Sequence, residues 1–193
     1  MKEIIKKRIK ESIDVKEKVL HDEIIVAQIE KLCKEVLQGL KKGNKVIFAG
    51  NGGSCSDAFH LAGEFVSRFI FDRPALASIA LGGNNSIITA IGNDYSYEEI
   101  FSRELFALGN EGDIFIPIST SGNSGNIINA IKTANDKGLI TMGFTGETGG
   151  KMKDLCDCIC VPSKNTGRIQ ESHILIGHLL CELVEKTYFE KEN

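Results

Sequence analysis

Five short apolar runs, alternating with segments of helical periodicity, constrain most strongly what this chain of 193 residues can fold into. Each run is bounded by turn residues, which is typical of parallel strands buried on both faces: KVIFAG, ALASIAL, DIFIPIS, LITMGFTG and CICVP. The helical segments cover residues 56–69, 87–108 with a break at GND, 126–137 and 168–190, and a short turn is expected near Lys151. The alternation predicts an α/β fold, a parallel sheet with helices on both faces.

Two further helices are predicted before the first strand. Over residues 22–42, apolar side chains recur every three or four positions, the stripe of an amphipathic helix that Gly43 can end. Residues 1–20 have a thinner apolar face, which would bury well only against a partner such as another subunit. No repeat or linker divides the chain, so we expect a single domain over residues 1–193.

Charge and hydropathy exclude several classes of partner. The formal net charge of −3 provides no general field for attracting nucleic acid or an anionic membrane, so an anion must be held by a local site. No segment reaches the ~20 apolar residues of a membrane span, and the charged N-terminus lacks the apolar core of a secretory signal. We expect a cytoplasmic protein without a nucleic-acid or membrane partner.

The six cysteines are expected to be reduced thiols, as in most cytoplasmic chains of this size. Cys156, Cys158 and Cys160 alternate in the last strand, so their side chains should share one face. That spacing suits the packing of small apolar side chains better than a tetrahedral thiolate site, which remains the alternative.

Two polar turns lie where an open parallel sheet binds ligands, beyond the carboxyl ends of its strands. NGGS follows the first strand and STSGNSGN, residues 119–126, follows the third, and each precedes a helix whose N-terminal N–H groups favour an anion. A simple helix cap is the alternative for STSGNSGN, but the run holds more hydroxyl donors than a cap requires. The sequence therefore favours a phosphate site there. Neither GxxxxGK[ST] nor GxGxxG occurs, which disfavours nucleoside triphosphates and dinucleotides.

Candidate reactive side chains lie in two helices. His60 and Glu64 are four residues apart in GNGGSCSDAFHLAGEF, so their side chains can meet, either as a surface pair or as a metal or acid–base pair. In the last helix, Gln170 and His178 are separated by about 12 Å along the axis. That separation is near the limit for sharing one centre, so this helix alone argues only weakly for a shared site.

Five motifs, in order between about residues 50 and 185, resemble the phosphoheptose isomerases of the sugar isomerase (SIS) superfamily: GNGGSCSDAFHLAGEF, IGNDYSYEEIFSRE, ISTSGNSGNIINAI, GETGGKM and RIQESHILIGHLLCELVE. The resemblance implies a flavodoxin-like three-layer α/β/α sandwich, a five-stranded parallel sheet with added N-terminal helices. It also implies a homotetramer in which residues 1–43 pack at subunit interfaces and active sites draw on neighbouring chains.

The same resemblance assigns the site residues. Four positions match a site for one zinc ion per subunit: His60, Glu64, Gln170 and His178. A larger set matches positions that contact the sugar phosphate: Asn51, Gly52, Gly53, Ser54, Glu64, Asn93, Asp94, Ser119, Thr120, Ser121, Ser124 and Gln170. Gly167 stands where some relatives carry an acidic residue, so no function is assigned to it.

The implied reaction converts sedoheptulose 7-phosphate to D-glycero-D-manno-heptose 7-phosphate, the first step toward the activated heptoses of bacterial surface polysaccharides such as lipopolysaccharide and capsule. Glu64 is expected to act as the base and His178 as its acid–base partner, with zinc polarising the carbonyl. Two alternatives stay open: a non-catalytic SIS module that senses a phosphosugar or accompanies a replication initiator, and an isomerase of another phosphosugar. The presence of His60, Glu64 and His178 favours an enzyme.

Overall fold

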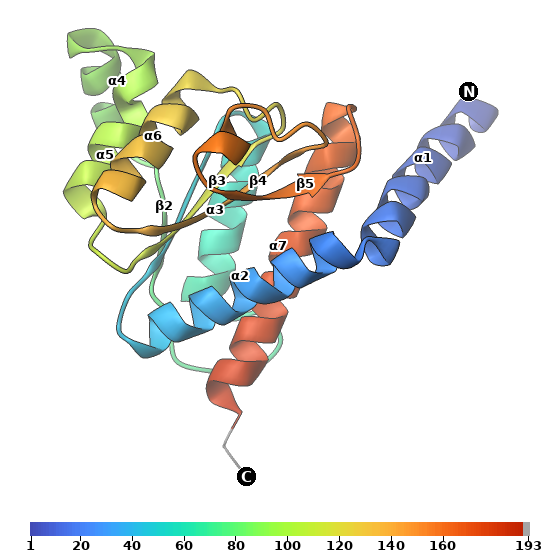
Figure 1. Cartoon of the computed structure of the whole chain (residues 1–193), viewed down its shortest axis with the longest axis horizontal. Helices are drawn as coiled ribbons and strands as arrows, with labels where there is room; N and C mark the ends of the chain where they lie inside the picture. Colours follow the sequence, from blue (N-terminus) through green and yellow to red (C-terminus); the bar gives the residue numbers. More distant parts are fainter. Residues whose placement is uncertain (191–193) are drawn as a thin grey trace.

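A computed structural model describes residues 1–190, so the last three residues of the predicted domain lie outside the described part. A sheet of parallel strands in the order β2-β1-β3-β4-β5 forms the middle layer (Figure 1). This order is the flavodoxin-like one, which confirms the predicted fold class. The strands are β1 (Val46–Gly50), β2 (Ser78–Ala80), β3 (Ile114–Ser119), β4 (Ile140–Gly146) and β5 (Asp157–Val161).

Helices cover both faces of the sheet. On one face lie α2 (Glu23–Lys41), α3 (Gly53–Val66) and α7 (Thr166–Phe189), joined by the end of α1 (Lys2–His21). The other face carries α4 (Asn85–Asp94), α5 (Ile100–Leu108) and α6 (Gly125–Asp136), with short 3₁₀ turns η1 (Tyr97–Glu99) and η2 (Met152–Asp154). No helix within residues 1–190 has the length and apolar character needed to cross a bilayer.

Alternate residues of the central strands fill two separate cores. In β1, Val46 and Phe48 pack toward α2, α3 and α7, whereas Ile47 and Ala49 pack toward α5 and α6. All four are fully buried, because each strand is covered on both faces. This arrangement is why the strands are unbroken apolar runs in the sequence.

Three element boundaries differ from the sequence predictions. α3 runs from Gly53 to Val66, three residues earlier than expected at both ends, because the turn at Gly52 starts the helix directly and the chain leaves it at Ser67. The break within residues 87–108 falls after Asp94, so GND stays helical as the end of α4. β2 is shorter than the run ALASIAL suggested.

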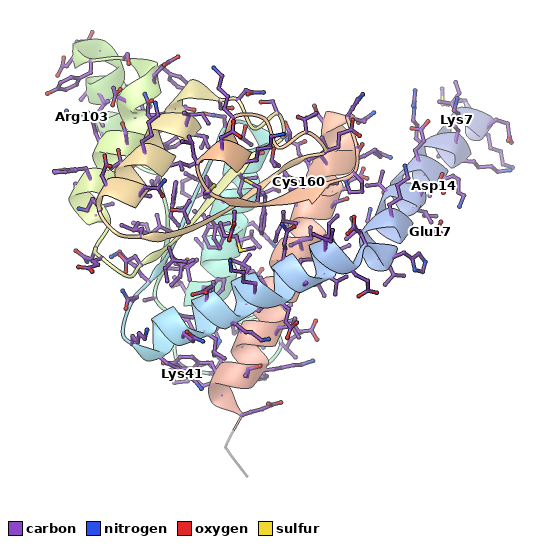
Figure 2. All side chains as sticks on the ribbon, in the orientation of Figure 1. Lys7, Asp14, Glu17, Lys41, Arg103 and Cys160 are labelled. Carbon is purple, nitrogen blue, oxygen red and sulfur yellow. The ribbon has the colours of Figure 1, made fainter. Side chains whose placement is uncertain are left out.

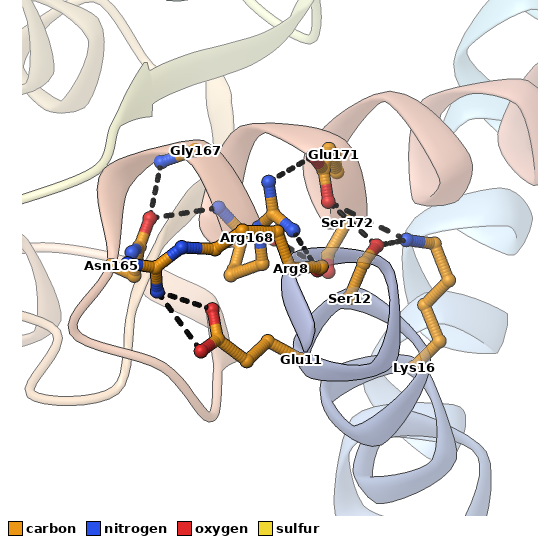
Figure 3. A network of polar contacts seen from close by, with 9 residues as sticks. All are labelled: Arg8, Glu11, Ser12, Lys16, Asn165, Gly167, Arg168, Glu171 and Ser172. Carbon is orange, nitrogen blue, oxygen red and sulfur yellow. Dashed lines mark hydrogen bonds and ion pairs between the residues drawn. The ribbon is translucent and has the colours of Figure 1, made fainter. Parts of the chain in front are cut away.

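The N-terminal helix α1 makes polar contacts with the first turns of α7 (Figure 3), and Val15 and Val19 near its C-terminal end pack into the core. Nη1 of Arg168 donates to the Arg8 carbonyl at 2.6 Å, and the Ser12 hydroxyl donates to Glu171 at 2.6 Å. The outer half of α1 extends beyond the sandwich, and Lys7, Asp14 and Glu17 lie on the surface of the helix (Figure 2). Its aliphatic side chains also remain exposed, as the thin predicted stripe suggested: Ile4, Ile5, Ile9 and Ile13.

The cysteines are all free thiols, as predicted. Cys158 is buried on β5, and Cys156 and Cys160 pack against the same core, so the three side chains share one face. Within residues 1–190 no group of three or more histidine, cysteine, aspartate or glutamate side chains is arranged to hold a metal ion. The three thiols of the CDCIC run pack against the core between the sheet and the helices α5 and α6, on the shared face that their alternation predicted.

Candidate active site

Close packing of α3 against α7 brings the predicted reactive side chains together. A Cβ atom at Gly177 would lie 2.5 Å from Cδ2 of Leu61, so only glycine permits this approach. Leu61 follows His60 in α3, and Gly177 precedes His178 in α7. The contact between the two helices therefore places His60 beside His178, two residues that the sequence spacing alone could not connect.

The two histidines and Glu64 form a compact polar cluster. Nε2 of His60 lies 2.9 Å from Nε2 of His178 and 3.4 Å from Oε1 of Glu64. At 2.9 Å one ring nitrogen must donate a hydrogen to the other, so the pair shares a proton between two bases. The His60 side chain is 47% exposed and that of Glu64 is 24% exposed, so the cluster is open to a small molecule.

Gln170 lies at the other end of the same helix pair. A Cβ atom at Gly53 would be 2.5 Å from Nε2 of Gln170, so the amide occupies the space beside the first turn of α3. The structure thus places Gln170 against the Gly52–Ser54 segment rather than against the histidine pair. This position fits a contact of Gln170 with the substrate better than coordination of a metal ion by Gln170.

The turn after β1 is tied to two elements of the opposite layer. The side-chain amides of Asn51 and Asn126 bond reciprocally at 2.8 and 2.9 Å, and the Tyr97 hydroxyl donates to Oδ1 of Asn51 at 3.0 Å. Ser54 is buried, with its N–H bonded to the Asn51 carbonyl. Asn126 and Tyr97 were not identified as site residues from the sequence, although Asn126 is the last residue of the STSGNSGN run.

The turn after β3 forms one wall of a cavity of about 300 Å³. Ser119 and Ser124 hydroxyls lie 3.1 Å apart, and Gly146 N–H donates to the Thr120 carbonyl at 3.1 Å, which fixes the turn against the end of β4. Thr120 and Ser121 line the cavity, together with Lys164 and the first residue of α7. The sequence analysis did not identify Lys164, because it stands in a polar loop, SKNTG, that is typical of exposed turns.

Asn93 and Asp94 are placed differently from the rest of the predicted set. Both are exposed at the end of α4, and Nδ2 of Asn93 donates to Oδ1 of Asp94 at 2.9 Å. In the described chain, no hydrogen bond links either side chain to the two turns or to the histidine pair. The single chain therefore does not bring these two residues into the cluster.

Burial shifts the pKa of two ionisable groups close to the cluster. Asp57, one turn before His60, has its pKa raised by burial although the nearby histidine acts in the opposite direction. Its Oδ2 atom is buried without a hydrogen-bond partner among the described residues. Burial also raises the pKa of the Cys55 thiol, which keeps it protonated. The sequence analysis did not identify Asp57 as a site residue. Its position three residues before His60, which places both on one face of a helix, was the signal that could have indicated it.

His173 stands on α7 between Gln170 and His178 but faces the core. Burial lowers its pKa to about 4, and its Nε2 donates to the Thr145 carbonyl at 3.1 Å, at the end of β4. It is therefore neutral near pH 7. Its role is to fix α7 to the sheet, so it is not an acid–base candidate.

The donor set around His60 fits a metal ion only in part. Two nitrogen ligands of a tetrahedral zinc ion lie about 3.3 Å apart, and the distances from His60 to His178 and Glu64 lie near that value. Gln170, however, is turned toward Gly53, and the described residues contain no complete group of three ligands. His60, Glu64 and His178 are thus the side chains that could hold a metal after small rotations.

Comparison with known proteins gives the family. A family model described as an SIS domain matches residues 9–146. The phosphoheptose isomerase of Aneurinibacillus thermoaerophilus is 58% identical over 193 residues, which covers 100% of this chain and 98% of that protein. The chain belongs to the phosphoheptose isomerase family.

Other members of the phosphoheptose isomerase family match over most of their length. The phosphoheptose isomerase 2 of Campylobacter jejuni is 55% identical, covering 97% of this chain and 94% of that protein. The solved structure from Neisseria gonorrhoeae has a TM-score of 0.88 at 37% identity, covering 96% and 98% of the two chains. That from Francisella tularensis has a TM-score of 0.89 at 35% identity, covering 95% and 97%.

In this phosphoheptose isomerase family member, Gly53→Ala should disturb the site without unfolding the protein. The new methyl group would displace the Gln170 amide, which is the far end of a flexible side chain. A displacement of about 1 Å can lower turnover by up to about 100-fold. We expect kcat to fall by about 10-fold or more, measured in a sugar phosphate isomerisation assay.

Gly63→Ala is the matched control, because it lies in the same helix with no atom within 4 Å of the added Cβ. That variant should keep wild-type turnover and gain roughly 0.5–1 kcal/mol of stability from its higher helix propensity. Equal turnover in the two alanine variants would contradict the assignment of Gln170 to the site.

Proposed function

We propose that this chain is an aldose–ketose isomerase that converts sedoheptulose 7-phosphate to D-glycero-D-manno-heptose 7-phosphate. The observation that carries the proposal is the cluster of His60, Glu64 and His178, with Nε2 of His60 within 3.4 Å of both partners. The phosphoheptose isomerase relatives, up to 58% identical, support the choice of substrate.

The reaction moves a carbonyl group by one carbon through a cis-enediol. Glu64 takes a proton from C1 while His178 gives one to the carbonyl oxygen at C2. Glu64 then returns its proton to C2, and His178 takes the proton of the C1 hydroxyl, so both residues end as they began. The neighbouring imidazole of His60 keeps the orientation of both groups, since it contacts each of them.

The phosphate of the substrate binds at the turn after β3. Hydroxyl groups of Thr120 and Ser121 and the N-terminus of α7 face the same cavity and favour an anion. Lys164 lines it too, paired with Glu147 at 3.2 Å, and would turn from that carboxylate to the phosphate. The turn after β1 then contacts the sugar between the phosphate and the histidine cluster. Binding the phosphate at one end positions C1 and C2 at the other.

We further propose that the enzyme binds one zinc ion per subunit through His60, Glu64 and His178, with Gln170 as the fourth ligand once its side chain turns away from Gly53. The support is the convergence of two imidazole nitrogens and a carboxylate oxygen around His60. When bound, zinc would polarise the carbonyl and stabilise the negative charge of the enediolate. Since a zinc-bound carboxylate is a weaker base, either Glu64 is free of the ion when it takes the proton or the metal is partly structural.

The catalytic roles predict two losses of turnover. Glu64→Gln removes the base and His178→Ala removes its partner, so each should lower kcat by about 10²–10⁴-fold while the fold is kept. The measurement is conversion of sedoheptulose 7-phosphate followed by NMR, with circular dichroism as the check on folding.

Glu182→Gln is the matched control, because Glu182 stands on the same helix and pairs with Lys186 at its surface. It should react at the wild-type rate. If folded wild-type protein supplied with zinc makes no aldose product, the isomerase proposal is wrong and a phosphosugar-binding module becomes the better description. Turnover of a different phosphosugar alone would indicate another substrate.

The metal proposal predicts zinc in the purified protein. Elemental analysis should find about one ion per subunit in the wild type and a large loss in His60→Ala, because that variant removes the central donor. His21→Ala is the control, since His21 lies at the end of α1, and it should retain the ion. Full activity in protein that contains no metal would refute a catalytic metal.

We also propose a homotetramer with α1, α2 and α7 at its interfaces. These three helices enclose an apolar cavity of about 510 Å³, and Leu20 and Leu183 on its wall remain 67% and 44% exposed. Burying such surfaces against further copies is favourable at about 25 cal/mol per Å².

The tetramer predicts that Leu20→Glu/Leu183→Glu will form smaller species, because two carboxylates cannot be buried in an apolar interface. Light scattering coupled to size exclusion measures the mass. Ala107→Glu, which adds the same charge at an exposed position of α5, should leave the tetramer intact. A wild type that runs as a monomer would exclude the proposal.

The remaining proposals concern cell biology. The enzyme is proposed to work in the cytoplasm, where its sugar phosphate substrate is made. Its product would supply activated heptose for a surface polysaccharide, either lipopolysaccharide or capsule.

A further inference from the structure

A buried ion pair outside the reactive cluster joins α7 to the loop that follows α3. Nε of Arg73 lies 2.8 Å from Oε2 of Glu185, and their side chains are 3% and 0% exposed. Arg73 belongs to the loop between α3 and β2, residues 67–77, and Glu185 stands two turns after His178 on α7. A buried ion pair of this kind is stable only where neighbouring groups also form hydrogen bonds with both charged side chains, which offsets the loss of their hydration.

Glu185 organises the backbone of the α3–β2 loop. Its carboxylate accepts the N–H groups of Phe69, Ile70 and Phe71 at 2.7, 2.5 and 3.2 Å, in addition to the Arg73 guanidinium. Burial alone would raise the pKa of Glu185, but these four donors outweigh burial and hold the pKa below its ordinary value. The carboxylate is therefore ionised, and all its bonds go to the loop.

The loop held in this way contacts the reactive cluster directly. The ring of Phe69 packs against the ring of His178, with centroids 5.4 Å apart. Because Glu185 binds the Phe69 N–H, the carboxylate fixes the residue that packs against one face of the His178 imidazole. His178 is thus placed between His60 and a phenyl ring whose backbone is anchored.

Arg73 acts on the other side of the cluster, at the end of α3. Its Nη2 donates to the Glu64 carbonyl at 2.9 Å and its Nη1 to the Phe65 carbonyl at 2.7 Å. These are carbonyls of the last helical turn, which have no partner within the helix. Arg73 therefore fixes the backbone of Glu64 itself while it is paired with Glu185 on the other helix.

We propose that Arg73 and Glu185 are positioning residues of the isomerase, whose buried pair sets the separation of Glu64 on α3 from His178 on α7. The proposal rests on the proposed function, in which those two groups transfer the protons. Neither positioning residue is assigned a contact with substrate. They act through the Glu64 backbone and through the packing of Phe69.

The first experiment separates positioning from folding. Arg73→Lys keeps the charge opposite Glu185 but loses the donors to the Glu64 and Phe65 carbonyls. Arg73→Met/Glu185→Gln removes both charges and leaves an amide oxygen for the loop N–H groups. At a temperature where circular dichroism shows each protein folded, we expect kcat to fall by about 10- to 100-fold with KM for sedoheptulose 7-phosphate within about 2-fold.

Lys45→Met/Asp113→Asn is the matched control. That pair also joins a nearly buried carboxylate to a basic side chain, but the other side-chain hydrogen bonds of Asp113 go to the backbone of Lys45 and Asn110, and among residues 1–190 none goes to α3, α7 or the loop between α3 and β2. It should lower the melting temperature and leave kcat unchanged. Wild-type kcat in both folded Arg73 variants, or an equal fall in the control, would overturn the proposal.

A second readout does not depend on turnover. The imidazole resonances of His178 and His60 in ¹H–¹⁵N spectra report ring position and protonation, and they should shift in Arg73→Lys but not in the Lys45/Asp113 control. Unchanged resonances would refute the positioning role. If wild-type protein fails to turn over the substrate while the resonances shift as expected, the proposed function is wrong and the positioning role stands.

Discussion

The close contact between α3 and α7 is the constraint on which the site depends. It is fixed at three levels: Gly53 against Gln170, Leu61 against Gly177, and the carbonyl end of α3 against Glu185 through Arg73. The middle contact requires glycine and the last is a fully buried ion pair, for which removing one partner costs about 3–5 kcal/mol. The helix pair is therefore held rigidly at both ends, with the reactive side chains between them.

The remainder of the sandwich supports this pair from the two sides. The neutral His173 bonds the end of β4 and fixes the start of α7 to the sheet. The reciprocal amide pair of Asn51 and Asn126 joins the two turns that precede α3 and α6. A substrate held at its phosphate end would thus meet the histidine cluster at a distance set by the sheet.

Local pattern was sufficient to predict much of this arrangement. The five apolar runs indicated the strands, because a strand buried on both faces must be apolar throughout. The spacing of His60 and Glu64 predicted their contact, since positions four apart share one face of a helix. Two residues of the hydroxyl-rich run after β3 line a cavity, and the anion site predicted there from the density of donors stays a prediction.

Other features depended on contacts between distant parts of the chain. The sequence analysis placed the start of α3 three residues too late. The helix begins at Gly53, directly after the turn at Gly52, and helical periodicity alone does not indicate where such a turn ends. Lys164 was not predicted because it lies in a polar loop whose sequence resembles any exposed turn. Tyr97 was not predicted because nothing in its local sequence indicates the contact with Asn51. Asn93 and Asp94, predicted at the substrate, bond to each other at the exposed end of α4 and are not brought to the cluster in the single chain.

The sequence by itself determined the layer architecture and the strand positions, because these follow from short-range periodicity, and its resemblance to a known family indicated the candidate reactive side chains. Only the tertiary structure decided that His178 meets His60 and that Gln170 lies beside Gly53. It also revealed the pairing of Arg73 with Glu185, 112 residues apart in the chain. The physical reason is that interhelical separation depends on glycine contacts and buried charge pairs between segments far apart in sequence, which no local pattern encodes.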